Sequence, residues 1–125
     1  MTVILDTNAL MMPVECDLRL FDELERVLGD VECVVPEAVL AELEKLSAGA
    51  GAEATAARVG RDLAERCTVR STDAAYADDA VLELASEAGV EAAVTNDAPL
   101  QERLLDAGVS VVSLRGNDKL AINNP

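Results

Sequence analysis

Short strand-like runs alternate with helical segments along the chain, and this alternation is the strongest constraint on its fold. Five runs are predicted as strands: residues 2–5, 31–35, 68–71, 91–95 and 109–114. Strands separated by helices favour a parallel sheet with right-handed crossovers. We therefore expect an α/β domain of three layers (αβα), with a central parallel sheet of about five strands.

Helical segments are predicted in the intervals between these runs. They cover residues 7–12, 17–28, 36–46, 53–67, 79–88 and 97–107. In the second, apolar residues recur at helical spacing, with Asp17 as the expected N-cap and Gly29 as the stop. Pro13 is expected to break or redirect the first helix, and Pro36 suits the first position of the third. A flexible connector is expected at residues 47–52.

The length and hydrophobicity of the chain suit one compact domain. It has 125 residues, of which 50% are hydrophobic, and no repeat or linker divides them. We expect a single domain over residues 1–125, in which residues 115–125 show no clear period and form a short tail. No signal peptide or membrane-spanning run is recognisable, so a cytoplasmic protein without membrane contact is expected.

Four acidic residues stand where such a fold can bring them to one place. Asp6 and Asp97 follow predicted strands, Glu42 lies on the helix over 36–46, and Asp79 opens a helix. Open α/β sheets place their sites beyond the carboxyl ends of strands. Each acid alone has an ordinary explanation, as an N-cap, a first-turn acid or a solvated helix residue. The four together indicate a functional site.

The residue types limit the chemistry of this site. The chain has no histidine, which excludes Ser-His-Asp triads and histidine zinc sites. Cys16, Cys33 and Cys67 form no Cys-x-x-Cys motif and are expected to be small buried apolar residues in a reducing compartment. Carboxylates without His or Cys favour a hard cation, Mg²⁺ or Mn²⁺. This donor set indicates metal-assisted phosphodiester chemistry.

The charge balance of the chain is strongly acidic. Its formal net charge is −14 and its sequence pI is about 4.1, which argues against a large basic surface for nucleic acid. Only two lysines, Lys45 and Lys119, accompany eight arginines. This composition is typical of proteins from halophiles that accumulate salt, because at molar salt the Debye length falls to about 3 Å and carboxylate repulsion is screened.

Four short motifs, in this order and spacing, resemble those of the PIN domain family, a metal-dependent nuclease fold. They are Asp-Thr-Asn at 6–8, Val-Pro-Glu-Ala-Val-Leu-Ala-Glu-Leu at 35–43, Ala-Asp-Asp-Ala-Val at 77–81 and Val-Thr-Asn-Asp at 94–97. The resemblance spans nearly the whole chain. The single-domain form is similar to archaeal PIN proteins of the rRNA-processing branch, and VapC-type toxins share the fold and the acids.

The resemblance implies a divalent-metal-dependent endoribonuclease that acts in rRNA processing or as a VapC-type toxin. It implies catalytic and metal-binding roles for Asp6, Glu42, Asp79 and Asp97, with Asp78 as an additional or outer ligand. It implies supporting or substrate-contacting roles for Thr7, Asn8, Thr95 and Asn96. The implied partners are an RNA substrate, a second copy in a homodimer, and an antitoxin or a ribosome-assembly protein. Arg103 and Arg115 are the candidate RNA contacts.

Three other functions are alternatives to this one. A haloacid-type phosphatase needs a second Asp two residues after the first, where this chain has Asn8. A phospho-receiver domain needs a Lys after its last strand, where this chain has Arg115. A catalytically silent PIN-fold scaffold in an RNA or ribosome-assembly complex is compatible with the sequence.

Overall fold

The computed structural model describes residues 1–125 and contains one mixed sheet of six strands. The strands are β1 (Thr2–Leu5), β2 (Glu32–Pro36), β3 (Thr68–Arg70), β4 (Val90–Val94), β5 (Ser110–Arg115) and β6 (Lys119–Asn123). Their order is β3-β2-β1-β4-β5-β6, and only β6 is antiparallel to its neighbour. The predicted fold class is confirmed, with one strand more than expected.

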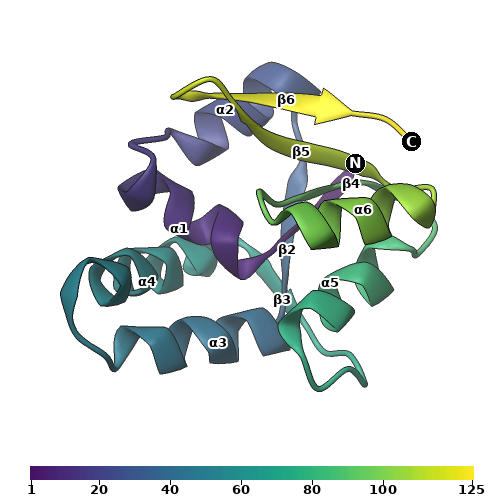
Figure 1. Cartoon of the computed structure of the whole chain (residues 1–125). Helices are drawn as coiled ribbons and strands as arrows, with labels where there is room; N and C mark the ends of the chain where they lie inside the picture. Colours follow the sequence, from purple (N-terminus) through teal and green to yellow (C-terminus); the bar gives the residue numbers. More distant parts are fainter.

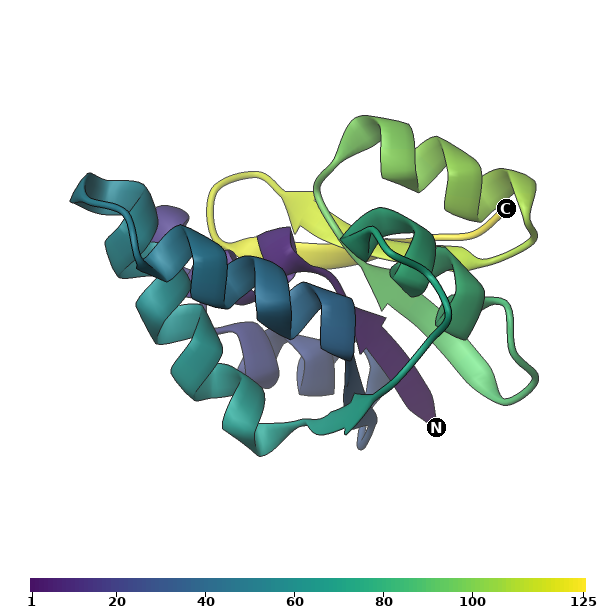
Figure 2. The same cartoon turned by 90° about the horizontal axis from the view of Figure 1, so that it is seen from below.

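Helices cover both faces of this sheet (Figures 1 and 2). They are α1 (Thr7–Glu15), α2 (Leu20–Leu28), α3 (Glu37–Ser47), α4 (Gly51–Leu63), α5 (Ala77–Ala85) and α6 (Ala98–Asp106), with a 3₁₀ turn η1 (Ala64–Arg66) after α4. Right-handed crossovers from β1 to β2 and from β2 to β3 place α1 to α4 on one face. The crossovers to β4 and β5 place α5 and α6 on the other. No helix is long and apolar enough to cross a membrane.

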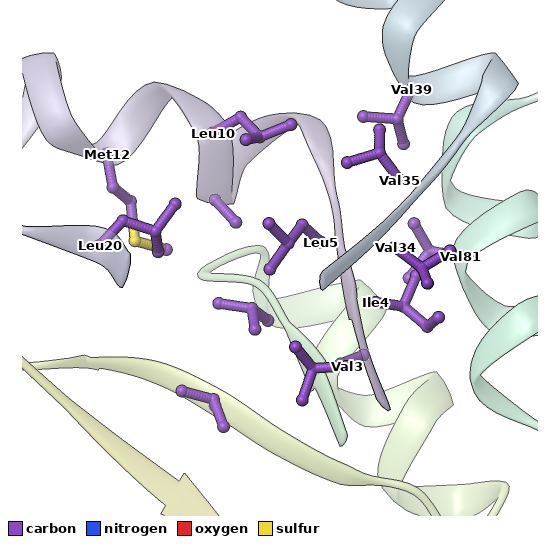
Figure 3. Packing of buried hydrophobic residues seen from close by; sticks show 14 of the residues in the cluster. Val3, Ile4, Leu5, Leu10, Met12, Leu20, Val34, Val35, Val39 and Val81 are labelled. Atoms are coloured by element: carbon purple, nitrogen blue, oxygen red, sulfur yellow. The ribbon is translucent and has the colours of Figure 1, made fainter. Parts of the chain in front are cut away.

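The core forms on both faces of the central strand β1. Val3, Ile4 and Leu5 are fully buried, as expected for a strand covered by helices on each side. Figure 3 shows Ile4 near Val34 and Val81 on one side of β1, with Leu5 pointing to the other side, on which Leu10 of α1 lies. The scarcity of aromatic residues is met by close packing of Val, Leu and Ala side chains.

Helices α1 and α4 approach each other closely at Gly60. A Cβ atom added at Gly60 would lie 2.7 Å from the backbone oxygen of Leu10 and 3.1 Å from its carbonyl carbon. Real Cβ atoms essentially never come within 3.0 Å of another heavy atom, and the obstacle here is backbone. Glycine at this position therefore sets the distance between the two helices.

We expect Gly60→Ala to destabilise the fold by roughly 1–3 kcal/mol, the usual cost of an added methyl in a packed region. Alanine gains helix propensity of about 1 kcal/mol over glycine, so a loss would show that the clash dominates. Gly49→Ala is the control, because its Cβ would meet only the Leu46 oxygen at 3.4 Å. Urea unfolding of both variants measures the difference, and equal midpoints would contradict close packing at Gly60.

Residues 115–125 were expected to form a tail, and this prediction is wrong for most of them. Lys119–Asn123 forms the antiparallel edge strand β6, in which Leu120 is 2% exposed and belongs to the core. Side chains of α2 bind its backbone: Leu120 N donates to Glu23 Oε1 (2.8 Å), and Arg26 Nη2 donates to the Leu120 oxygen (2.7 Å). These contacts come from a helix far away in the sequence, so no local sequence pattern predicts the strand.

Three local expectations also need correction. Helix α1 continues through Pro13 to Glu15, although Pro13 has no N–H to donate to the carbonyl oxygen of Ala9. Asp17 does not cap α2; it has φ 51° in the turn before that helix, whose N-cap is Arg19. Pro36 ends β2 in an extended conformation and precedes the first helical residue of α3. The predicted stop at Gly29 is confirmed.

Candidate functional site

The switch point of the sheet lies between β1 and β4. These strands are neighbours, and the chain leaves β1 for β2 in one direction and β4 for β5 in the other. Leu5 pairs with Val94, and Asp6 N donates to the Val94 oxygen at 3.3 Å. Asp6 and Asp97 therefore both lie just beyond the carboxyl ends of adjacent strands, where open α/β sheets form their sites.

Both aspartates also cap helices. Asp6 Oδ1 accepts a hydrogen bond from Ala9 N at 2.6 Å at the start of α1, and Asp97 Oδ2 accepts one from Leu100 N at 3.0 Å at the start of α6. The ordinary N-cap explanation for Asp97 is thus correct, and it does not compete with a place in the site. The capping bonds fix the orientation of each carboxylate above the sheet.

A polar cleft of about 440 Å³, which we call the acidic cleft, opens above this point. Asp6 is buried at 4% exposure, whereas the other acids are exposed around it. Its lining includes six acidic residues, namely Asp6, Glu15, Glu42, Glu53, Asp78 and Asp97, with Thr7, Asn8, Met11, Leu46, Asn96 and Ala98. Only three of these 12 residues are hydrophobic, so the cleft suits ions and polar groups better than an apolar ligand.

The structure separates the two neighbouring aspartates of α5. Asp78 lines the acidic cleft, and Asp97 and Glu42 are close enough to act on its charge. Asp79 instead accepts a hydrogen bond from Arg103 of α6 at 2.8 Å and does not line the cleft. The structure therefore brings Asp78 together with Asp6, Glu42 and Asp97, in the place that the sequence motif suggested for Asp79.

The electrostatics of the acidic cleft disfavour ionised carboxylates. Burial raises the pKa of Asp6 from 3.8 to about 7; hydrogen bonds from the Thr95 hydroxyl and Ala9 amide offset part of this effect. Burial, followed by repulsion from Asp97 and Glu42, also raises the pKa of Asp78, and Arg103 lowers it only in part. The chain thus supplies too little positive charge to balance these acids.

The four polar residues flanking Asp6 and Asp97 have distinct positions. Asn8 Oδ1 accepts a hydrogen bond from Asn96 N (3.0 Å), and Asn96 Oδ1 accepts one from Leu114 N (2.7 Å). The two side chains thus connect the start of α1, the segment after β4 and strand β5. Thr95 is fully buried beneath the cleft, and its hydroxyl accepts from Asp97 N at 3.0 Å. Thr7 Oγ1 is buried in the lining and has no hydrogen-bond partner.

Sequence reasoning missed Glu15 and Glu53, which extend the acidic lining. Glu15 ends α1 and Glu53 lies in the first turn of α4, and these two helices pack against each other. No spacing in the sequence links them. Neither of the two candidate RNA contacts lines the cleft. Arg103 lies next to it, because it pairs with Asp79, the neighbour of Asp78, whereas Arg115 is the last residue of β5.

The donor chemistry of the acidic cleft fits a hard divalent cation. Its charged groups are all carboxylates, its buried Asp6 lacks a compensating cation, and the Thr7 hydroxyl lacks a partner. No three acidic side chains, however, are placed as a group that could hold one ion. Ion binding in this cleft therefore requires rearrangement of the exposed carboxylates around Asp6.

Comparison with known proteins assigns the family. A profile described as PIN like domain matches residues 3–117. The chain belongs to the PIN-like domain family. The match runs from the second residue of β1 to just past the end of β5 and includes all the acids of the cleft. No protein among the curated sequences matches the chain.

Solved structures agree with this PIN assignment. The structure of the PIN domain endonuclease Utp24 matches with a TM-score of 0.80 and 26% identity, over 99% of this chain and 92% of that chain. A domain of a functionally unknown protein from Methanocaldococcus jannaschii DSM 2661 matches with a TM-score of 0.66 and 20% identity, over 92% of this chain and 91% of that one. The second likeness concerns the fold alone.

Proposed function

We propose that this PIN-like protein is a divalent-metal-dependent endoribonuclease. The observation that carries the proposal is the acidic cleft, where Asp6, Glu42, Asp78 and Asp97 come from four different parts of the chain. Similarity to a PIN domain endonuclease over nearly the full chain supports nuclease chemistry. Acidic residues without a function are not expected to cluster at the switch point of the sheet, because repulsion between their carboxylates lowers the stability of the fold.

The residues of the cleft have separate roles in this proposal. Asp6, Glu42, Asp78 and Asp97 would hold Mg²⁺ or Mn²⁺, which when bound would polarise a phosphoryl oxygen and acidify a water molecule. Asn8 and Asn96 hold the ends of β1, β4 and β5 in register around them. Because the chain lacks histidine, a carboxylate must take up any proton released near neutral pH.

RNA is the proposed substrate, as the resemblance of the sequence motifs implies, and similarity to a PIN domain endonuclease supports cleavage within a nucleic-acid chain. A net charge of −14 repels a polyanion at low ionic strength, so binding should depend on the cation and improve in concentrated KCl. Action in rRNA processing and action as a VapC-type toxin are both compatible with this site. A homodimer, an antitoxin and a ribosome-assembly protein are the proposed protein partners.

The test is cleavage of a folded RNA pool in Mn²⁺ or Mg²⁺ at high KCl, with wild type beside Asp97→Asn. We expect wild type to cleave only with the cation, and Asp97→Asn to lose cleavage while asparagine preserves the N-cap of α6. The cation should also raise the wild-type melting temperature by roughly 5–10 °C, and the mutant should respond less. Cleavage that persists in EDTA would refute the proposal.

A catalytically silent scaffold is the alternative, and one observation favours it. The carboxylates of the cleft do not converge on a single point. A scaffold would bind RNA or an assembly partner without cutting RNA, whatever cation is present. Wild-type protein that shows the expected metal-dependent melting shift, yet leaves the RNA pool intact, would support this alternative over the nuclease.

A further inference from the structure

Two cysteines lie side by side at one edge of the sheet, away from the acidic cleft. Strand β2 pairs with β3 in parallel register, with Val34 opposite Thr68. Cys33 precedes Val34, and Cys67 precedes Thr68 with an extended backbone at φ −114° and ψ 159°. The register therefore continues by one residue and sets Cys33 opposite Cys67, with both side chains on the same face of the sheet.

The spacing of this pair suits a covalent bond. Neighbouring strands lie roughly 4.8 Å apart, and disulfides join residues whose Cα atoms are about 4.4–6.8 Å apart. Both thiols are free and only partly buried. The neighbouring Cys67 thiol lowers the pKa of Cys33, and Cys33 together with burial raises that of Cys67, as expected for two adjacent thiols.

Cys33 is also open to a small reagent. It lines a cavity of about 270 Å³ together with Phe21 and Arg66, and the Arg66 guanidinium lies 4.0 Å above the Phe21 ring. The positive charge of Arg66 favours the thiolate form of Cys33. A thiolate beside a cation and open to solvent is the form that attacks disulfides.

We propose that Cys33 and Cys67 are a thiol–disulfide exchange site, which low-molecular-weight disulfides convert to a Cys33–Cys67 disulfide. The Cys33 thiolate attacks one sulfur of the reagent RSSR, forms a mixed disulfide and releases RS⁻. The Cys67 thiolate then attacks the Cys33 sulfur and releases a second RS⁻. The two protein thiols lose two electrons, RSSR gains them, and the two protons leave on two molecules of RSH. The site is independent of the proposed nuclease function.

The experiment is exchange of reduced wild-type protein with excess oxidised glutathione, compared with protein kept in dithiothreitol. Trypsin places Cys33 in the peptide 27–45, Cys67 in 67–70 and Cys16 in 1–19. We expect one free thiol to remain of the three, and a linked peptide joining 27–45 to 67–70. The melting temperature should rise on the order of 5–10 °C, because the bond constrains the unfolded chain.

Matched variants distinguish this pair from general thiol reactivity. Cys16→Ser should behave as wild type and form the same linked peptide. Cys67→Ser should stop at the mixed disulfide, with one glutathione on Cys33 and no rise in melting temperature. Three retained thiols, separate glutathione adducts on Cys33 and Cys67, or a disulfide containing Cys16 would each overturn the proposal. The wild-type peptide map decides the matter even if a variant folds poorly.

Discussion

Replacing Asp78 with asparagine is expected to lower the rate of RNA cleavage by at least about 100-fold, whereas the same change at Asp79 should lower it less than about tenfold. Asp78 lines the acidic cleft beside Asp97 and Glu42. Asp79 is engaged by Arg103 outside it. Loss of a residue that merely orients a metal ligand typically costs 10–100-fold, so loss of a direct ligand should cost no less.

The two variants control for each other, because they remove the same charge from adjacent positions of α5. Single-turnover cleavage at saturating Mn²⁺ compares the chemical step, and a Mn²⁺ titration separates weaker ion binding from slower chemistry. Both aspartates are exposed in the first turn of the helix, so their effects on helix stability should be similar. A larger loss at Asp79 than at Asp78 would contradict the assignment of Asp78, rather than Asp79, to the metal site.

Replacing Asp6 with asparagine should make the metal-free protein more stable at pH 8, by roughly 2–4 kcal/mol. Burial raises the pKa of Asp6 from 3.8 to about 7, so the folded state keeps a proton that the unfolded state releases. The free energy of unfolding therefore falls as pH rises above 3.8 and levels off above about 7, with a total change of roughly 4 kcal/mol. Asparagine does not titrate and still caps α1.

Urea unfolding in EDTA and concentrated KCl, at pH 5 and pH 8, measures this effect. Wild type should lose roughly 2–3 kcal/mol more than Asp6→Asn over that interval. Asp118→Asn is the control, because Asp118 is exposed and does not line the cleft. It shows how much stability the protein gains merely from losing one negative charge, given a net charge of −14. Parallel pH curves for wild type and Asp6→Asn would show that the buried carboxyl carries no such cost. The same substitution should abolish cleavage, so stability and activity would move in opposite directions.

Three acids of the cleft, Asp6, Glu42 and Asp97, could be predicted from the sequence because local patterns determine where they lie. Asp6 and Asp97 follow short apolar runs that are typical of buried strands, and the ends of adjacent parallel strands meet. Glu42 follows from its place on the helix after β2. The adjacency of β1 and β4 was a condition of this prediction, and the strand order of the sheet meets it.

The choice between Asp78 and Asp79 depended on the rotation of one helix. Neighbouring residues on a helix point about 100° apart, so a motif that contains both leaves the choice open. A usable signal was present: Asp78 lies three residues before Val81 and seven before Ala85, which are both buried, so it shares their face. Asp79 lies about 100° further round the helix, away from this buried face, where it meets Arg103.

Other features could not be predicted from local sequence patterns. Glu15 and Glu53 enter the cleft only because α1 and α4 pack together at Gly60, and no periodicity encodes that approach. Strand β6 is short and carries both polar and apolar residues. Its identity as a strand depends on pairing with β5 and on the side chains of α2, which are contacts between residues far apart in the chain.

The hydrogen bonds between side chains of α2 and the backbone of Leu120 affect how the protein behaves at high concentration. An edge strand normally offers free N–H and C=O groups, which can template the strand of another molecule and start aggregation. Here Glu23 and Arg26 occupy both groups of Leu120, and Arg26 lowers the pKa of Glu23 to about 2, so the carboxylate keeps its charge under mildly acidic conditions. The backbone groups of Leu120 are thus unavailable for intermolecular strand addition. This protection matters in a chain whose surface charge no longer keeps molecules apart once salt has screened it.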